Sequence, residues 1–312
     1  MARIVIALGG NALGNTPEEQ LDKVANAAKA IVDFVSQGHD VIIGHGNGPQ
    51  VGMIYNSMDF SSKNGGKTPA MPFPECGAMS QGYIGYHLQN AIMRETRKRG
   101  INKDILTIIT QVEVSKDDKA FENPTKPIGS FITEEEAKAI MAEHPDLTYI
   151  DDAGRGWRRV VPSPLPIDIV EKNAILEAVE KDNIVIACGG GGIPVVKNGE
   201  GDYTGVAAVI DKDFACEKLA ELVDADYLFI LTAVDRVSIN YNTPEQVDLK
   251  EMTVEEAEKY SAEGHFKPGS MLPKVIACKT FASSKEGRKA VIVSLEKAAL
   301  AMTGESGTVI TK

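Results

Sequence analysis

Three glycine-rich loops, each directly after a short apolar run, constrain the fold of this chain most strongly. The run and loop pairs are residues 3–8 with 9–11, 41–43 with 44–48, and 184–188 with 189–192. Short β-branched runs of this kind are typical of buried strands in a parallel sheet, where the loops gather at the carboxyl ends of the strands. Glycine lets backbone amides approach a phosphate closely. The pattern therefore predicts a phosphate site at one edge of a parallel sheet.

Apolar residues at helical spacing alternate with these strands. We expect a helix from residue 17 to a stop at Gly38, further helices at 78–98, 134–141, 168–181, 214–222, 254–262 and 270–283, and further strands at 106–110, 227–231, 290–293 and 308–311. The alternating order implies parallel strands covered by helices on both faces, an α/β class of fold. Basic residues crowd the end of the helix at 78–98, where cations favour the negative end of the helix dipole.

Residues 115–166 interrupt this alternation of strands and helices with two proline-rich stretches and a short acidic helix. An irregular insertion of this length within an α/β domain often covers a site, so we expect a protruding lid subdomain here. The chain as a whole, residues 1–312, is expected to form a single domain around one sheet.

Composition excludes several classes of protein. The formal net charge of −11 argues against nucleic acid as a partner, because a phosphate backbone requires a basic surface. The four cysteines form no CxxC pair, which excludes a zinc ribbon and a dithiol redox motif and fits a reducing compartment. Neither a signal peptide nor a membrane-spanning stretch is visible, and we expect a cytoplasmic protein.

The glycine loops do not match the two commonest nucleotide-binding motifs. Neither G-x-G-x-x-G nor G-x-x-x-x-G-K-[ST] occurs, so a Rossmann dehydrogenase and a Walker-type NTPase both lose support. His45 lies within one loop and has two interpretations, a general base or a turn residue whose ring hydrogen-bonds the backbone. The second interpretation is favoured.

Three lysines stand in restrained settings that suit the binding of a moving phosphoryl group, which requires cations around it. Lys126 lies between two prolines, Lys212 between two aspartates, and Lys274 directly after a proline. Each could equally be a solvated surface residue. Asp211 and Asp213 also have two compatible interpretations: charges at a helix N-terminus, or carboxylates that orient the lysine between them and hold magnesium.

Longer strings in the sequence resemble the carbamate kinases, which have the amino-acid-kinase fold. The strings are LGGNA (8–12), HGNGPQVG (45–52), NPTKPIG (123–129), DDAGRGWR (151–158), VPSP (161–164), CGGGGIPV (188–195), VIDKD (209–213) and PGSMLPK (268–274). The resemblance covers essentially the whole chain. It implies a three-layer αβα sandwich around a mainly parallel sheet, a homodimer, and a protruding subdomain that closes on the site.

The same resemblance implies a reaction and its participants. ATP and carbamate would interconvert with ADP and carbamoyl phosphate, with magnesium as cofactor, and most relatives would make ATP during arginine breakdown. Magnesium would be held mainly by the nucleotide phosphates, with no side-chain ligand assigned. Carbamate already carries an anionic oxygen, so no general base is needed, and catalysis would consist of positioning and charge stabilisation.

Residue roles follow from the resemblance position by position. The catalytic residues would be Lys126, Lys212, Asp213 and Lys274. The carbamate or phosphoryl end would bind Gly9, Gly10, Asn11, Asn47 and Gly48. The nucleotide would bind Gly189, Gly190, Gly191, Gly192, Asp211, Thr232, Ala233, Asp235, Tyr241, Met271, Leu272 and Pro273. Ala233 stands where relatives often have glycine, which could alter nucleotide affinity. The segment at residues 73–76 is less typical of these kinases and is assigned no role.

Two rival interpretations stay open at this stage. The first is another kinase of the same fold that phosphorylates a larger carboxylate, such as acetylglutamate or aspartate. The second is a non-catalytic nucleotide sensor, whose usual mark is loss of the lysines, and all three are present here.

Overall fold

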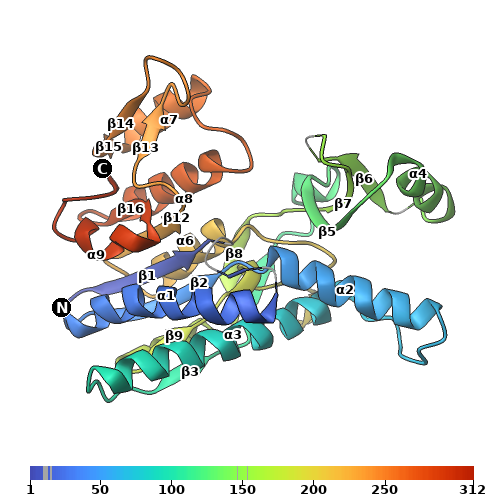
Figure 1. Ribbon diagram of the computed structural model, residues 1–312, viewed down its shortest axis with the longest axis horizontal. Helices are drawn as coiled ribbons and strands as arrows, with labels where there is room; N and C mark the ends of the chain where they lie inside the picture. Colours follow the sequence, from blue (N-terminus) through green and yellow to red (C-terminus); the bar gives the residue numbers. More distant parts are fainter. Residues whose placement is uncertain (10–12, 15, 146, 153) are drawn as a thin grey trace.

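An eight-stranded sheet forms the centre of the computed structural model, which describes residues 1–9, 13–14, 16–145, 147–152 and 154–312. Its strands, in spatial order, are β15 Glu251–Thr253, β17 Thr308–Thr311, β16 Lys289–Ser294, β12 Tyr227–Thr232, β1 Arg3–Leu8, β2 Asp40–His45, β9 Ile184–Ile186 and β3 Ile105–Thr107. All neighbouring pairs are parallel except β16 with β17. Figure 1 shows the sheet between layers of helices.

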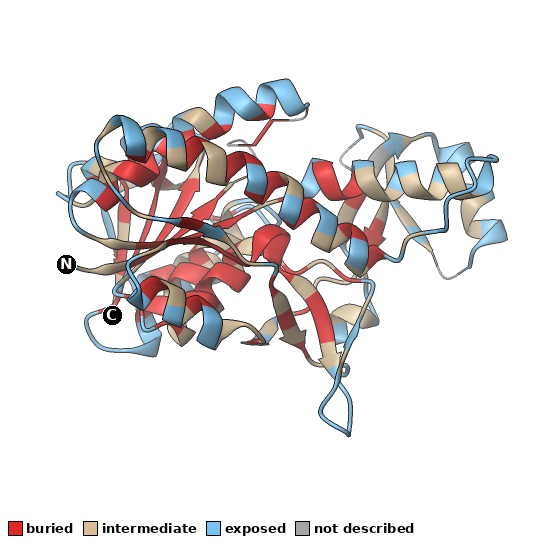
Figure 2. Cartoon of the chain, turned by 90° about the horizontal axis from the view of Figure 1, so that it is seen from below, coloured by how far each residue is buried: buried red, intermediate tan, exposed pale blue. Residues whose placement is uncertain are grey.

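Side chains of the central strands alternate between two separate hydrophobic cores, because successive residues of a strand point to opposite faces. Val5 and Ala7 of β1 belong to one core, whereas Ile4 and Ile6 belong to the other. Figure 2 shows the strands buried between the helical layers. Burial on both faces explains why these strands are apolar along most of their length.

Helices cover both faces and complete a three-layer αβα sandwich. One face carries α1 Pro17–Ser36, α3 Phe73–Lys98 and α9 Ala298–Ala301; the other carries α5 Lys172–Glu180, α6 Lys212–Leu222, α7 Val254–Ala262 and α8 Met271–Ser284. Short 3-10 turns are η2 Lys119–Phe121, η3 Gly189–Gly191 and η4 Leu295–Lys297. Thr16 caps α1 by accepting the backbone N–H of Glu19, as expected at a helix start. The expected α/β class and layer order are therefore confirmed.

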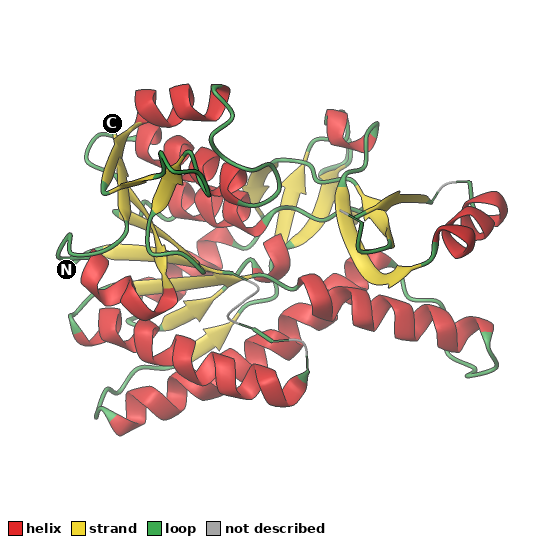
Figure 3. Cartoon of the chain, turned by 45° about the horizontal axis from the view of Figure 1, so that its top comes forward, coloured by secondary structure: helices red, strands yellow, loops and turns green. Residues whose placement is uncertain are grey.

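Three smaller sheets lie outside the main one. Their strands are β11 Tyr203–Gly205, β10 Ile193–Lys197, β4 Gln111–Val114 and β8 Pro166–Ile169; then β13 Val237–Ile239 with β14 Val247–Leu249; and β5 Lys126–Ile132, β7 Trp157–Val161 and β6 Thr148–Asp151. The last sheet and α4 Glu134–Glu143 stand out from the body beside α2 Gly48–Lys63 (Figures 1 and 3). We call residues 126–161 the protruding segment.

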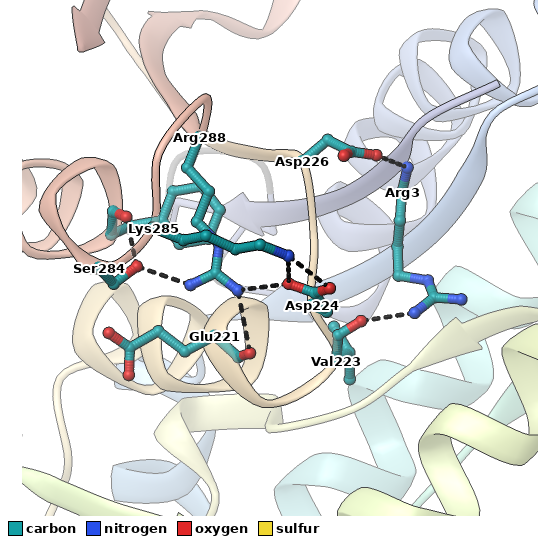
Figure 4. Close-up of polar contacts among 9 residues, drawn as sticks. Arg3, Glu221, Val223, Asp224, Asp226, Ser284, Lys285 and Arg288 are labelled. Atoms are coloured by element: carbon teal, nitrogen blue, oxygen red, sulfur yellow. Dashed lines mark hydrogen bonds and ion pairs between the residues drawn. The ribbon is translucent and has the colours of Figure 1, made fainter. Parts of the chain in front are cut away.

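A polar network joins the C-terminal ends of α6 and α8 (Figure 4). The Arg288 guanidinium donates to Ser284 Oγ at 2.6 Å, to the Glu221 carbonyl at 3.2 Å and to Asp224 Oδ1 at 2.9 Å. Lys285 donates to both Asp224 carboxylate oxygens at 2.8 Å. Hydrogen bonds from Lys285 and Arg288 hold the Asp224 pKa below its usual value. The two helices are thus tied together at the end opposite their N-termini.

Most expected elements occur within a few residues of their predicted bounds, with three differences. The predicted helix at 168–181 begins only at Lys172, because residues 166–169 pair with β4 as an antiparallel strand. Helix α2 was not predicted at all, and α3 begins five residues before the expected start at 78. In the described part of the chain, no helix is long and apolar enough to cross a membrane.

Candidate active site

The carboxyl ends of the central parallel strands meet at one edge of the sheet, as the loops predicted. Leu8 lies opposite both His45 and Leu231 in the strand register, so the loops after β1, β2 and β12 are neighbours. Helices α6 and α8 both begin at this edge, at Lys212 and Met271. Helix N-termini carry partial positive charge and free backbone N–H groups, which attract phosphate.

Asp213 holds two lysines at the start of α6 and α8. Its carboxylate accepts hydrogen bonds from Lys212 Nζ through one oxygen and from Lys274 Nζ, at 2.8 Å, through the other. The Asp213 side chain is only 3% exposed. Burial opposes the charge of Lys212, but Asp213 and Asp211 outweigh it and raise the Lys212 pKa. Lys212 is therefore held in its charged form, and the Nζ atoms of both lysines lie on the same carboxylate.

Two adjoining cavities open beside this cluster. The first, of about 430 Å³, is lined by Gly9, Lys212, Leu231, Thr232, Ala233, Gly269, Ser270, Lys274, Leu295 and Glu296. The second, of about 710 Å³, is lined by residues 232–234, 264–267, 270, 271 and 274 and by Arg236, Ser238, Asn240, Tyr241 and Thr243. The first contains the two lysines and suits phosphates. The second is larger and suits a nucleoside.

Asp211 connects the third lysine to the same helix. Its Oδ1 accepts the backbone N–H of Asp213 at 2.9 Å and caps α6, while its Oδ2 accepts from Lys126 Nζ at 2.7 Å. Burial would raise the Asp211 pKa, but the charges of Lys126 and Lys212 and these hydrogen bonds lower it to about 2. The aspartates thus act as a helix cap and as lysine partners, whereas the part of the second interpretation in which they hold magnesium stays a prediction.

The third glycine loop packs against Asn47 instead of lining the two cavities. Gly190, Gly191 and Gly192 all have positive φ, which a side chain would strain. A Cβ on Gly190 would lie 2.1 Å from Asn47 Nδ2, so only glycine permits this contact. Asn47 donates to Ser80 Oγ at 2.8 Å, and with Gly190 and Gly192 it borders a small pocket next to Val209.

His45 is a structural residue and does not line either large cavity. The ring is fully buried, and Nδ1 lies 2.9 Å from the Gly46 carbonyl, to which it donates. Burial lowers the His45 pKa to about 4, against the opposing effect of that hydrogen bond. The ring is therefore neutral near pH 7. Its hydrogen bond to the backbone is as expected, but His45 is the last residue of β2 and not a turn residue.

The structure brings together only part of the predicted site. Of the predicted residues, Gly9, Lys212, Thr232, Ala233, Tyr241, Met271 and Lys274 line the two large cavities. Asp235 instead accepts hydrogen bonds from Ser294 and Lys297, and Leu272 packs partly buried against the core. Gly48 is exposed at the start of α2, Gly189 packs on His45, and Pro273 lies in the first turn of α8. Gly10 and Asn11 lie outside the described residues.

Sequence reasoning missed several residues that line the cavities. Gly269 and Ser270 belong to the PGSMLPK sequence at the start of the helix expected from residue 270, and could have been chosen as its N-terminal phosphate contacts. Glu296 and His265 carried no sequence signal. Their positions depend on how η4 and the loop before α8 fold back to the strand ends.

The arrangement can bind and polarise an anionic phosphoryl group. Two cations on one carboxylate, with two helix N-termini beside them, stabilise charge that spreads over phosphoryl oxygens during transfer. Among the described residues, no group of three or more His, Cys, Asp or Glu side chains is placed to hold a metal ion.

Comparisons with known proteins agree with this geometry. The amino acid kinase family model matches residues 2–294. The chain is 55% identical over 315 residues to a carbamate kinase of Clostridium perfringens, covering 99% of this chain and 100% of that protein. It is 51% identical over 308 residues to the carbamate kinase-like protein YqeA of Escherichia coli, covering 99% and 98%. The solved carbamate kinase of Giardia lamblia bound to AMP-PNP superposes with a TM-score of 0.92 at 41% identity, covering 100% and 98%.

Proposed function

The chain belongs to the amino acid kinase family, and on that premise we propose that it is a carbamate kinase. It would transfer a phosphoryl group reversibly between carbamoyl phosphate and ADP. The observation that carries the proposal is the Lys212–Asp213–Lys274 cluster in the smaller cavity, in a chain whose full-length relatives include carbamate kinases. ATP and ADP as substrates are supported by the likeness to a structure that contains AMP-PNP.

The proposed transfer is direct. A β-phosphate oxygen of ADP bonds to the phosphorus of carbamoyl phosphate, and the bond from phosphorus to the carbamoyl oxygen breaks. Carbamate leaves with the electron pair as an anion, so no proton has to be moved at that oxygen. Lys212 and Lys274 would neutralise charge on the moving group, and Asp213 would hold both ammonium groups in place.

Substrates would divide between the cavities. The larger one, next to Tyr241 and Met271, would take adenine and ribose, and the smaller one would take the phosphates. The carbamoyl end would bind the residues that the family resemblance assigns to it, which are Gly9, Gly10, Asn11, Asn47 and Gly48. Magnesium would be bound to the nucleotide phosphates. Glu296 is the only carboxylate among the described residues that line the smaller cavity, and it offers the kind of oxygen ligand that magnesium prefers.

The decisive experiment is an assay of ATP formation from ADP and carbamoyl phosphate, run beside assays with acetylglutamate or aspartate and ATP. We expect ATP formation only with carbamoyl phosphate. Phosphorylation of an amino-acid carboxylate instead would overturn the proposal in favour of another kinase of this family. Binding of ADP without any turnover would favour a nucleotide sensor.

Two lysine variants test the mechanism. Lys212→Ala and Lys274→Ala should each lower kcat by about 10²–10³-fold, the usual effect of removing one preorganised charge from a transition state. Lys279→Ala is the matched control, since this lysine lies on α8 but pairs with Glu258. Circular dichroism checks that the variants fold. Near-normal turnover in either variant would remove that lysine from the mechanism.

We also propose that two copies associate through the edge of the main sheet that β3 forms. Tyr86, Leu106 and Ile109 are exposed on α3, on β3 and in the loop after it, and α3 packs on β3 where Gly85 meets Thr107. An exposed edge strand with apolar neighbours favours pairing with a partner. Tyr86→Glu should convert a dimer into a monomer in light scattering after gel filtration, whereas Phe60→Glu, exposed on α2, should not.

The proposed setting is the cytoplasm, with ATP made from carbamoyl phosphate during arginine breakdown. The acidic composition and buried free cysteines suit a reducing compartment. Cell fractionation tests the location, and loss of ATP-linked growth on arginine after gene deletion tests the pathway.

A further inference from the structure

Lys126 makes a contact that the proposed transfer does not use. It is the first residue of β5 and therefore the first residue of the protruding segment. Its Nζ donates to Asp211 Oδ2 at 2.7 Å, across 85 positions of the chain. The two side chains are 35% and 18% exposed, so the pair is partly shielded from water. Lys126 therefore has an anionic partner within the protein itself.

The same carboxylate performs a second task. Through Oδ1 it accepts the backbone N–H of Asp213 and caps α6, the helix that begins with Lys212. The pKa of Asp211, lowered to about 2, shows that its charged form is strongly favoured. The Asp211 carboxylate thus links the start of the protruding segment to α6, the helix that carries Lys212 and Asp213.

The other contacts of the protruding segment lie mainly on α2. Ile128 and Val161 share a small core with Val51, and Gly129 approaches Gly52 so closely that a Cβ on Gly52 would lie 2.7 Å from its backbone. Arg159 stacks on Tyr55 with its guanidinium carbon 5.0 Å from the ring centroid. Within the described residues, Lys126–Asp211 is the only ion pair between the segment and the rest of the chain.

We propose that Asp211 is a positioning residue that holds Lys126, and with it β5, beside the phosphoryl site until the anionic substrate replaces the carboxylate. This inference deepens the proposed function and rests on it for the identity of that substrate. Because Lys126 exchanges one anion for another, it reaches the substrate already desolvated and aimed. A preorganised cation of this kind loses little free energy to reorganisation at the moment of reaction.

Asp211→Asn separates the two tasks of this side chain. Asparagine caps helices as well as aspartate does, so α6 keeps its N-terminal hydrogen bond while Lys126 loses its anionic partner. In the ligand-free protein we expect amide hydrogen exchange in residues 126–132 to be about 3- to 10-fold faster, the scale of one partly shielded ion pair. Lys126→Met should give the same increase, and the double variant no more than either single one.

Asp118→Asn is the matched control. Asp118 also caps a helical turn, accepting from Ala120 N–H at 2.8 Å, but it does not contact Lys126. Exchange in residues 126–132 should stay at the wild-type rate in this variant. Unchanged exchange in Asp211→Asn would overturn the proposal. A uniform increase that includes α6 would also overturn it, because it would mean that the residue only stabilises the helix.

Adding carbamoyl phosphate distinguishes the proposed role of Asp211 from a purely structural one, because only the proposed role predicts that the substrate restores exchange. Addition of carbamoyl phosphate alone should restore wild-type exchange in Asp211→Asn, because the phosphoryl anion then holds Lys126, but not in Lys126→Met. The KM for carbamoyl phosphate should rise about 3- to 10-fold while that for ADP changes less, since ordering β5 now consumes binding free energy. A lowered KM would contradict this. If amide exchange in Asp211→Asn is faster without ligand but carbamoyl phosphate does not restore it, the positioning role of the Lys126–Asp211 pair would stand. Carbamoyl phosphate would then be rejected as the anion that replaces Asp211.

Discussion

A buried carboxyl group on α6 should make this protein lose stability in mild alkali. Glu217 lies one helical turn after Asp213, is only 4% exposed, and has one oxygen, Oε1, without a hydrogen-bond partner among the described residues. Burial and the neighbouring Glu221 raise its pKa from 4.5 to about 8, while Lys218 and Arg288 act weakly in the opposite direction.

The direction in which stability changes with pH follows from proton binding. Between pH 4.5 and about 8 the folded protein keeps the proton of Glu217, whereas the unfolded chain releases it. The stabilisation is therefore complete below pH 4.5 and is lost as the pH rises through about 8. At about 1.4 kcal/mol per pH unit, this interval corresponds to a loss on the order of 4–5 kcal/mol. Such a loss is a large part of the stability of an ordinary domain.

Glu217→Gln removes the titration and keeps the shape and a donor for Glu221. Urea unfolding at pH 5.5 and pH 9, at fixed protein concentration, measures the effect. We expect the variant to be more stable than wild type by roughly 4–5 kcal/mol at pH 9 and by only about 1–1.5 kcal/mol at pH 5.5. Glu180→Gln, at an exposed position on α5, should follow wild type at both values. Parallel pH profiles for wild type and Glu217→Gln would refute the reasoning.

Two further predictions concern buried thiols and their neighbours. Burial raises the pKa of Cys188, Cys216 and Cys278, so a thiol reagent at pH 8 should label them only after unfolding, as mass spectrometry before and after urea would reveal. Gly44→Ala should destabilise the fold by about 1–3 kcal/mol, because the added Cβ would lie 2.2 Å from Cys216 Sγ. The melting temperature measures this, and Gly199→Ala, which would meet no atom within 4 Å, should leave it nearly unchanged.

The central sheet could be predicted because its strands carry their own signal. Residues 4–8 and 227–231 form continuous runs of apolar and aromatic residues, as expected of strands with both faces buried. Helix α2 lacked such a signal. It begins with Gly48-Pro49, which is typical of a turn, and only three of its residues are buried. Its partners lie in α3 and, farther along the chain, in the protruding segment, so tertiary packing decides its conformation.

The lysines of the site could be proposed from their neighbours, but their partners could not. Asp213 lies next to Lys212 in sequence, yet its bond to Lys274 depends on α6 and α8 packing side by side. Lys126 reaches Asp211 only because the protruding segment folds back toward α6. The glycines at 189–192 identify a tight loop, but the sequence did not indicate that Gly190 and Gly192 would border a small pocket with Asn47 and not the two large cavities.

The two large cavities share Thr232, Ala233, Ser270 and Lys274 in their walls, so they form one continuous trough. An inhibitor restricted to the lysine end would have to be strongly anionic and would enter cells poorly. A fragment seated near Tyr241 can be neutral. A short linker past Ala233 would join it to a small acidic group, and the two weak binders would then gain from a shared effective concentration.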